Sequence, residues 1–408
     1  MVKNGVSILF RKNFYQGLEL QMTKKLPHYR FQGYTDAWEL RKLGEVVYRS
    51  NLTSSSKDLP RLEFEDINSG LGTLNKDISQ KVDDRKGLEF NEGDVLFGKL
   101  RPYLKNWWYA EFKGIALGDF WNLKSDLWHS CFLYTYIQSN SFQLVANDTS
   151  GTKMPRSDWN LVAESIAKFP SLPEQEAIGT FFSTLDQQIT LHQRKLDTLK
   201  EQKRTYLKLL FPAKGQTKPA LRFQGFEDDW KEVKLGEVLV EYNKKSEIEN
   251  QFELLSSTNS GIEPRSGRVS GESNIGYKII KRGMVVLSPQ NLWLGNINYN
   301  AKFEIGIVSP SYKVFNINGP NELYLATVLR LPKMFFEYAQ ASVQGASIVR
   351  RNLDLDLFGS ILVHLPSLPE QEAIGTFFQT LDQEIAQVED KLASLKEMKK
   401  TLLRKLFV

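Results

Sequence analysis

The sequence contains one long stretch twice, and this repeat constrains the fold more than any other feature. Residues 170–211 and 366–407 align over their whole length without a gap, and their first thirteen residues are identical. An internal repeat of this length predicts that the chain contains two copies of one structural unit.

Each copy has the pattern of a long helix. Both open on the residues LPEQE, which place Pro173 and Pro369 in the first turn, where a missing N–H costs little and acidic residues meet the positive helix end. Apolar residues then follow at alternating steps of four and three from 178 to 210 and from 374 to 406. This spacing predicts a coiled coil, and the alternative is two amphipathic helices that each lie on their own domain.

A lysine occupies one seam position near the end of each copy. If the two seams align end to end, Lys203 falls beside Asp382 and Lys399 falls beside Asp186. A Lys–Asp pair at each end would fix the antiparallel register by penalising slips. We expect replacement of both lysines by leucine to leave or raise thermal stability while loosening the register.

A second, shorter repeat precedes each long one. Residues 27–47 and 219–239 share an RFQG tetrapeptide, a tryptophan and a KLGEV run. Gly33 and Gly225 suit turns, and we expect these motifs to be packing corners, with a direct ligand site as the alternative. Each unit of the chain therefore consists of the short repeat, a middle segment and the heptad helix.

The two middle segments, residues 48–167 and 240–363, hardly match each other. Short apolar runs bounded by Gly, Asn and Pro predict strands at 94–98, 114–118, 278–280, 283–288, 303–308 and 312–317, in an irregular, mostly antiparallel sheet. Helices are predicted near 126–140 and 322–341. The predicted fold class is α+β, with two globular modules joined by two long antiparallel helices and a pseudo-twofold internal repeat.

The composition permits a polyanionic partner without requiring one. The chain has 53 basic and 48 acidic residues and a net charge of +5. Its single cysteine, Cys131, excludes a disulfide framework and favours a buried thiol in a reducing compartment. The usual nucleotide, metal and hydrolase motifs are absent, and so is the Asn/Asp-Pro-Pro-aromatic motif of amino-methylating enzymes. No apolar run approaches the length of a membrane span, so we expect a cytoplasmic protein without catalytic residues.

Residues 1–21 lie outside the repeat. They contain no signal-peptide core, and we expect no export. One hypothesis is that Met22 is an ancestral start and that residues 1–21 are an N-terminal extension, because the segment after Met22 is similar to residues 216–225.

Cationic, aromatic and amide-bearing runs in the middle segments are the candidate nucleic-acid contacts. Arg and Lys anchor phosphates and read guanine, whereas Asn and Gln read adenine. The candidates for DNA binding are Lys99, Arg101, Tyr103, Lys105, Lys153 and Arg156 in the first middle segment, and Gln290, Asn291, Asn296, Ser347, Arg350 and Arg351 in the second. For each of them, the alternative is a solvated surface charge or a packed side chain.

From about Lys24 onward, the order of segments resembles that of the DNA-specificity subunits of Type I restriction-modification systems. The resemblance is carried by the two LPEQEAI runs, the KLGE openings and residues 93–103, which match a run common in the target-recognition domains of that family. Residues 283–289 keep the turn and strand of this run but lose its Lys-x-Arg-Pro-Tyr end. We therefore expect the two modules to read different DNA sequences.

The resemblance implies a domain plan. Residues 22–167 would form the first target-recognition domain, 168–213 the central spacer helix, 214–363 the second target-recognition domain and 364–408 the C-terminal spacer helix. In this family each such domain reads one half of a split, asymmetric site in double-stranded DNA. The chain itself would be non-catalytic and free of cofactors and metals.

The resemblance also implies partners. Two adenine methyltransferase subunits, which use S-adenosylmethionine, would dock symmetrically, and two restriction subunits that use ATP and Mg are optional further partners. Because two near-identical helix starts can bind two identical partners, the docking candidates are Leu172, Glu174, Gln175, Phe181, Leu368, Glu370, Gln371 and Phe377. A rise of 1.5 Å per residue gives roughly 48 Å for residues 178–210, or roughly 14 base pairs, so the gap between half-sites should follow helix length. Two alternatives remain, a self-contained DNA-modifying enzyme and a coiled-coil protein scaffold without DNA binding.

Overall fold

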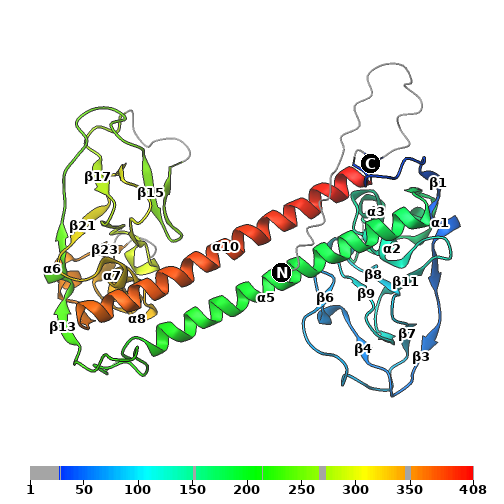
Figure 1. The fold of residues 1–408 in the computed structure, drawn as a ribbon, viewed down its shortest axis with the longest axis horizontal. Helices are drawn as coiled ribbons and strands as arrows, with labels where there is room; N and C mark the ends of the chain where they lie inside the picture. The colour runs from blue at the N-terminus through cyan, green and yellow to red at the C-terminus, as the bar shows by residue number, and fades with distance from the viewer. Residues whose placement is uncertain are drawn as a thin grey trace. The chain divides into compact units, whose positions relative to one another are not determined.

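The computed structural model describes residues 27, 29–149, 153–213, 215–265, 273–344 and 351–407, except for the side chains of 343, 344 and 351. The predicted extension at 1–21 lies outside the described residues. Contacts between residues divide the chain into two compact units (Figure 1). Unit 1 contains the chain up to Lys195 and the segment Val388–Val408, and unit 2 is Leu196–Gln387.

Two long helices confirm the prediction made from the repeat. Helix α5 (Leu172–Leu209) has 38 residues and α10 (Leu368–Leu406) has 39, with Pro173 and Pro369 in their first turns. Most apolar residues of the two predicted seams are buried, namely Ile178, Phe182, Leu185, Ile189, Leu196, Leu199 and Leu210 in the first copy and Ile374, Phe378, Leu381, Ile385, Val388, Leu392, Leu395 and Leu406 in the second. The chain follows α5 from unit 1 into unit 2 and follows α10 back.

Unit 1 contains two four-stranded sheets and two strand pairs. The strands of the first sheet are antiparallel and follow the order β2 (Tyr48–Ser50), β11 (Phe120–Lys124), β8 (Val95–Gly98) and β9 (Trp107–Tyr109). The second sheet follows the order β3 (Thr53–Ser54), β7 (Gly87–Phe90), β10 (Gly114–Ala116) and β4 (Arg61–Leu62), with β10 and β4 parallel. The strand pairs are β1 (Glu39–Lys42) with β12 (Ile166–Phe169), and β5 (Ile67–Asn68) with β6 (Thr73–Leu74).

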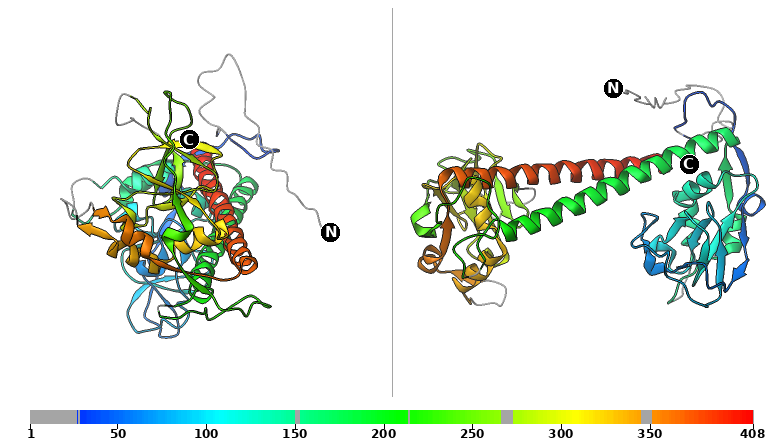
Figure 2. Two further views of the ribbon diagram at one scale, coloured as in Figure 1. Left: turned by 90° about the vertical axis from the view of Figure 1, so that its left-hand side faces the viewer. Right: turned by 60° about the horizontal axis from the view of Figure 1, so that its bottom comes forward.

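The helices of unit 1 connect these sheets to the long helices. They are α1 (Leu43–Val46), α2 (Ser130–Ile137), α3 (Asn140–Ala146) and α4 (Trp159–Glu164), with 3₁₀ turns η2 (Phe64–Asp66) and η3 (Pro102–Leu104). Helix α2 lies between α5 and the strands β8 and β9 (Figure 1). The C-terminal end of α10 lies beside the first part of α5 in the same unit (Figure 2). One core therefore combines Ile178 and Phe182 of α5 with Leu403, Leu406 and Phe407 at the other end of the chain.

Unit 2 repeats the central sheet of unit 1 strand for strand. Its order is β14 (Leu239–Glu241), β21 (Lys313–Ile317), β18 (Val285–Leu287) and β19 (Ile297–Tyr299). The strand pairs are β13 (Lys231–Lys234) with β24 (Leu362–Leu365), β15 (Leu255–Thr258) with β16 (Gly261–Pro264), β17 (Lys278–Lys281) with β20 (Ile305–Val308) and β22 (Ser342–Gln344) with β23 (Arg351–Leu353). Its helices are α6 (Leu235–Val238), α7 (Glu322–Leu329), α8 (Pro332–Gln340) and α9 (Leu355–Ser360), with a 3₁₀ turn η4 (Leu292–Leu294).

The predicted elements are present, with one break and with elements that the sequence did not predict. Each of the six predicted apolar runs contains a strand, namely β8, β10, β17, β18, β20 or β21. The helix predicted near 322–341 is two helices, because Pro332 lacks an N–H and disfavours helical backbone at Leu331, which is extended. The short helices α4 and α9 were not predicted. The fold is a mixture of helices and sheets, as predicted.

Candidate nucleic-acid interface

The two repeated segments meet in unit 1 at a buried ion pair. Arg30 Nε donates to Glu174 Oε1 at 2.7 Å and Nη2 donates to Oε2 at 2.6 Å, a bidentate geometry that gives strong, directional bonds. The two side chains are only 8% and 1% exposed. Gln175 Oε1 accepts the backbone N–H of His129 just before α2, and its Nε2 donates to the carbonyl of Pro170, each at 2.9 Å. These contacts, which we call the joint, fix the start of α5 to unit 1.

A glycine and a phenylalanine complete the joint. A Cβ atom at Gly179 would lie 2.6 Å from Cβ of Cys131, so only glycine lets α5 approach α2 this closely. Cys131, predicted to be buried, is only half-buried, and its Sγ donates to Tyr109 Oη at 3.5 Å. Phe181 packs edge-on against Phe31 at 5.5 Å between ring centroids. The RFQG motif and the LPEQEAIGTFF motif are therefore two sides of one contact.

Unit 2 contains the same joint. Arg222 donates to both carboxylate oxygens of Glu370 at 2.9 and 2.6 Å, and Gln371 Oε1 accepts the backbone N–H of Asn321 before α7 at 2.9 Å. A Cβ at Gly375 would lie 2.7 Å from the backbone nitrogen of Tyr324, and Phe377 packs against Phe223 at 5.8 Å. The identical residues of the two repeats thus make identical contacts inside the chain.

The contacts of the joint explain why these residues recur in both copies, and no partner protein is needed for the explanation. The side chains of Glu174, Gln175, Glu370 and Gln371 are buried and bonded within their own units, whereas Leu172 and Leu368 are 56% and 58% exposed. The docking of partners at this motif stays a prediction. Leu172 and Leu368 are exposed residues of the motif at which such docking would occur. The packing corners are confirmed, because Trp38 and Trp230 are core residues and Gly33 and Gly225 have φ values of +100° and +92°.

The two predicted Lys–Asp pairs are present. In unit 2, Lys203 Nζ contacts Asp382 Oδ1, and both side chains are substantially exposed. In unit 1, Lys399 Nζ lies 2.6 Å from both Asp186 Oδ1 and Gln138 Oε1, and the Lys399 and Asp186 side chains are 13% and 19% exposed. Burial raises the pKa of Asp186, although Lys399 opposes the shift. The pair in unit 1 is therefore the more buried of the two.

Two cationic segments that are far apart in the sequence meet at the edge of unit 1. Leu100 and Arg156 form an antiparallel bridge, Arg101 N–H donates to the carbonyl of Pro155 at 2.7 Å, and Ser157 N–H donates to the carbonyl of Lys99 at 2.9 Å. The predicted residues Lys99, Arg101 and Arg156 are thus brought together. We call this edge the basic surface of unit 1, and Asp119 pairs with two of its cations, Lys99 and Arg156.

A hollow of about 380 Å³ lies beside this surface and includes residues that sequence reasoning missed. The Arg49 guanidinium stands 5.0 Å from the ring centroid of Trp159 and 5.9 Å from that of Trp121. Asp119 accepts the Arg156 Nε hydrogen bond at 2.9 Å and lies 3.5 Å from Lys99 Nζ. No pattern in the sequence joins these residues, because they come from β2, β11, α4 and two loops.

The remaining candidates of unit 1 lie on the same loop or near it. Tyr103 is 57% exposed, and Arg101, Lys105 and Lys153 are exposed. Arg101 and Lys105 have φ values of +50° and +57°. Left-handed backbone costs free energy in residues other than glycine, and such strain concentrates at functional sites.

The candidates of unit 2 are divided by their surroundings. Gln290 is exposed and Asn291 is half-buried, but Asn296 is buried, with Oδ1 accepting from Ser257 Oγ at 2.8 Å and Nδ2 donating to the Ser257 carbonyl at 2.9 Å. Asn296 therefore supports its loop from inside, and its contact with a base stays a prediction. Ser347 and Arg350 lie outside the described residues, and Arg351 is described only as backbone of β23.

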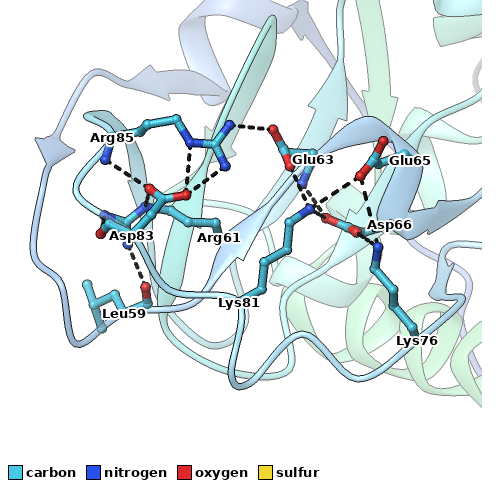
Figure 3. A network of polar contacts seen from close by, with 9 residues as sticks. All are labelled: Leu59, Arg61, Glu63, Glu65, Asp66, Lys76, Lys81, Asp83 and Arg85. Carbon is cyan, nitrogen blue, oxygen red and sulfur yellow. Dashed lines mark hydrogen bonds and ion pairs between the residues drawn. The ribbon is translucent and has the colours of Figure 1, made fainter.

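Another polar network in unit 1 is satisfied internally. Asp66 is fully buried, with Lys76 Nζ 2.9 Å from Oδ1 and Lys81 Nζ 2.7 Å from Oδ2, and both lysines point at it in Figure 3. Burial acts to raise the pKa of Asp66, but hydrogen bonds from Lys81 and Lys76 lower it below its usual value. Arg61 is also fully buried and donates to the carbonyls of Leu59 and Asp83 at 2.5 Å. Lys76, Lys81 and Arg61 are therefore bonded to acidic groups and carbonyls, and they stabilise the segment from β4 to β7.

Residues 35–201, which include the joint and the basic surface of unit 1, match the family model described as the Type I restriction modification DNA specificity domain. The matched part of unit 1 is thus similar to this DNA specificity domain, over less than half of the whole sequence. The chain is 31% identical over 91 residues to the Type I restriction enzyme EcoDI specificity subunit of Escherichia coli, a match that spans 22% of this chain and 20% of that relative. The chain therefore matches about a fifth of the length of this curated family member.

A solved S subunit structure shares the fold of this chain. The Type I restriction-modification S subunit from M. genitalium aligns over 94% of this chain and 99% of its own, with a TM-score of 0.61 and 17% identity. The HsdS subunit from Thermoanaerobacter tengcongensis aligns over 91% and 96%, with a TM-score of 0.41 and 19% identity. Within the part of this chain that the structure describes, no group of His, Cys, Asp or Glu side chains could hold a metal ion. None of its described helices has the length and hydropathy needed to cross a membrane.

Proposed function

We propose that this chain is the sequence-specific DNA-binding subunit of a Type I restriction-modification complex, and that each unit reads one half of a split, asymmetric site. The match of residues 35–201 to the model of the Type I restriction modification DNA specificity domain carries the proposal. Lys99, Arg101 and Arg156 support it, because two separate segments bring these cations to one edge of unit 1. The different residues at the corresponding edge of unit 2 suit a different half-site.

The proposed domain plan has target-recognition domains at 22–167 and 214–363 and spacer helices at 168–213 and 364–408, which pair as an antiparallel coiled coil. Two methyltransferase subunits dock near Leu172 and Leu368, which are exposed at equivalent positions. Methylation with S-adenosylmethionine, and restriction with ATP and Mg, belong to partner subunits. This chain supplies recognition and symmetry.

An electrophoretic mobility shift with duplex DNA tests the binding function directly. The full chain should shift random-sequence duplex at low salt, with an affinity that falls steeply as salt rises, because phosphate contacts release counterions. A chain that shifts no duplex at any salt concentration would instead be a protein scaffold. If the purified chain alone transferred methyl groups from S-adenosylmethionine to DNA, the non-catalytic assignment would be wrong.

Mapping of methylated adenine in cells that contain the complete system tests the two-half account. The wild type should produce a motif of two short halves separated by a fixed gap. Exchange of residues 48–167 for those of another family member should change one half, and exchange of 240–363 should change the other. A continuous motif, or a single exchange that changes both halves, would overturn the proposal.

A further inference from the structure

The two units contain one loop of the same length at the same place in their central sheets. In unit 1 it connects β8 to β9 and is closed by a hydrogen bond from Gly98 N–H to the Asn106 carbonyl at 2.7 Å. In unit 2 it connects β18 to β19 and is closed by a bond from Ser288 N–H to the Asn296 carbonyl at 3.0 Å. We call residues 98–106 loop A and residues 288–296 loop B.

The backbones of loops A and B match over their turns and at the residue that ends each turn. Each contains a 3₁₀ turn, η3 in loop A and η4 in loop B, in which Leu104 N–H donates to the Arg101 carbonyl at 2.8 Å and Leu294 N–H donates to the Asn291 carbonyl at 3.0 Å. Each turn ends at a left-handed residue, Lys105 in loop A and Gly295 in loop B, with φ values of +57° and +91°. Arg101 and Asn291 therefore occupy the same position, directly before the turn, although their backbones differ, with φ values of +50° and −124°.

The apolar residues of the two loops are also equivalent. Pro102 and Leu292 are buried and anchor the turns. Leu104 and Leu294, two positions further on, are 41% and 44% exposed. A shared anchor and a shared exposed leucine align loop A with loop B, and we call the nine aligned positions the frame.

Only some positions of this frame can read a base in both units. Lys99 is matched by Pro289 and Lys105 by Gly295, so neither cation has a polar counterpart in loop B. Gln290 is matched by Leu100, which has no hydrogen-bonding side chain. Tyr103 and Trp293 are both aromatic, and the two Asn residues at the closing position, Asn106 and Asn296, are buried. At the position of Arg101 and Asn291, each loop carries a hydrogen-bonding side chain, and these two side chains prefer different bases.

The floor beneath each loop differs as well. Strand pairing places Trp121 opposite Phe97 in unit 1 and Lys313 opposite Leu287 in unit 2, and these are corresponding registers. Arg49 stands over Trp121, whereas Lys313 Nζ pairs with Glu241 at 2.8 Å. The same frame therefore carries a cationic, aromatic setting in one unit and a neutralised ion pair in the other. Such a difference is expected if loops A and B are corresponding elements that read different bases.

We propose that loops A and B are the corresponding DNA-reading elements of the two units, with Arg101 and Asn291 as the residues that determine specificity. Arg101 would contact guanine through its fork of donors, and Asn291 would contact adenine, which pairs with an amide through one donor and one acceptor. The inference rests on the proposed function, because it names the residues that read each half-site. The backbone is left-handed at Arg101, with φ of +50°, and not at Asn291, with φ of −124°, so the two side chains leave their loops differently.

Selection from a random duplex DNA library by the full chain tests this assignment. The wild type should enrich a motif with two halves. Arg101→Ala should remove the preference for guanine at one position of one half by about tenfold or more, the range for one lost bidentate contact, and Asn291→Ala should remove a preference for adenine in the other half. Arg101→Asn should turn the guanine preference into one for adenine.

Two further variants keep the test decisive. Arg101→Gly relieves the left-handed backbone and should fold at least as well as the wild type, yet lose the same guanine. Arg41→Ala removes an exposed cation that is paired with Glu39 elsewhere in unit 1, and both halves should remain. If both halves survive Arg101→Gly and Asn291→Ala, or if binding weakens equally for all sequences, the assignment is wrong while the proposed function stands. A wild type that enriches no motif would overturn the proposed function as well.

Discussion

A carboxylate that is 1% exposed, such as that of Glu174, is stable in its charged form only beside a matching cation. Glu174→Ala would leave Arg30 as an uncompensated buried charge, and we expect it to lower the free energy of unfolding by about 3–5 kcal/mol. Chemical denaturation of the full chain measures this loss. Glu39→Ala breaks the exposed pair with Arg41 and should cost at most about 1 kcal/mol. Equal effects of the two variants would show that the joint is not an energetic anchor.

Asp66 should give the stability of unit 1 a characteristic dependence on pH. Its folded-state pKa lies below its ordinary value near 3.8, so the charged form is favoured by folding. The stabilisation is fully present above the unfolded-state pKa and is lost as the pH falls through the folded-state pKa. The difference in unfolding free energy between the wild type and Asp66→Asn should therefore be constant at neutral pH and shrink below about pH 4. The control is Asp36→Asn at an exposed site, and a difference that grows on acidification would contradict the assignment.

At the scale of elements, Gly179 determines how closely α5 approaches α2. Replacement of a helical glycine by alanine normally stabilises a helix by about 1 kcal/mol. At Gly179 the new Cβ would lie 2.6 Å from Cβ of Cys131, and we expect a net loss of about 1–3 kcal/mol from overpacking. Gly359→Ala in α9 is the matched control, because its nearest atom would be 3.7 Å away, and thermal unfolding should show no loss. Stabilisation by Gly179→Ala would mean that the two helices separate easily.

The two Lys–Asp pairs of the long helices should respond differently to the same substitution. From the sequence we expected leucine at both lysines to be tolerated. The structure changes this expectation at Lys399, because leucine there would leave the largely buried Asp186 without its cation, at a cost of about 1–3 kcal/mol or with uptake of a proton. Lys203→Leu should cost at most about 1 kcal/mol, since Lys203 and Asp382 are both partly solvated. Urea denaturation of the two single variants separates the cases, and equal losses would refute the difference in burial.

The long helices, the strands and the Lys–Asp contacts could be predicted because their signals are local or periodic. The structural role of Glu174 could not be predicted, because its partner Arg30 is distant in the sequence. In addition, repetition alone does not distinguish a residue buried in the fold from a residue exposed to a partner. Loops A and B were predicted as separate basic and amide-rich segments. Their equivalence depends on backbone hydrogen bonds and on glycine at 295 replacing a strained lysine at 105, which a comparison of residue types does not detect. The hollow at Arg49 depends on strand pairing between segments that have no shared motif.

At the scale of the whole molecule, the residues that are identical in the two units and the residues that differ between them serve different functions. The joint repeats because both units must fix the same kind of helix, so the same ion pair, amide contact and glycine recur. Loops A and B keep the same length, closing hydrogen bond and turn, and differ in their side chains and in the backbone at Arg101 and Asn291. In such a chain, the loop of one unit can change the DNA sequence that it reads while the joint still attaches that unit to its long helix. The recognition and attachment surfaces can therefore vary independently.

The length of the long helices should set the gap between the two half-sites. Lys195 and Gln387 are the positions at which α5 and α10 pass between the units, and each lies between the two Lys–Asp pairs. Insertion of seven helix-forming residues after both positions keeps the heptad phase and both ion pairs, and lengthens each helix by about 10.5 Å. At about 3.4 Å per base pair, the gap in the methylated motif should grow by about three base pairs while both halves stay the same. Insertion into α5 alone is the control and should destabilise the chain, because the two seams then differ in length. A doubly extended chain that methylates with the original gap would show that these helices do not act as the spacer.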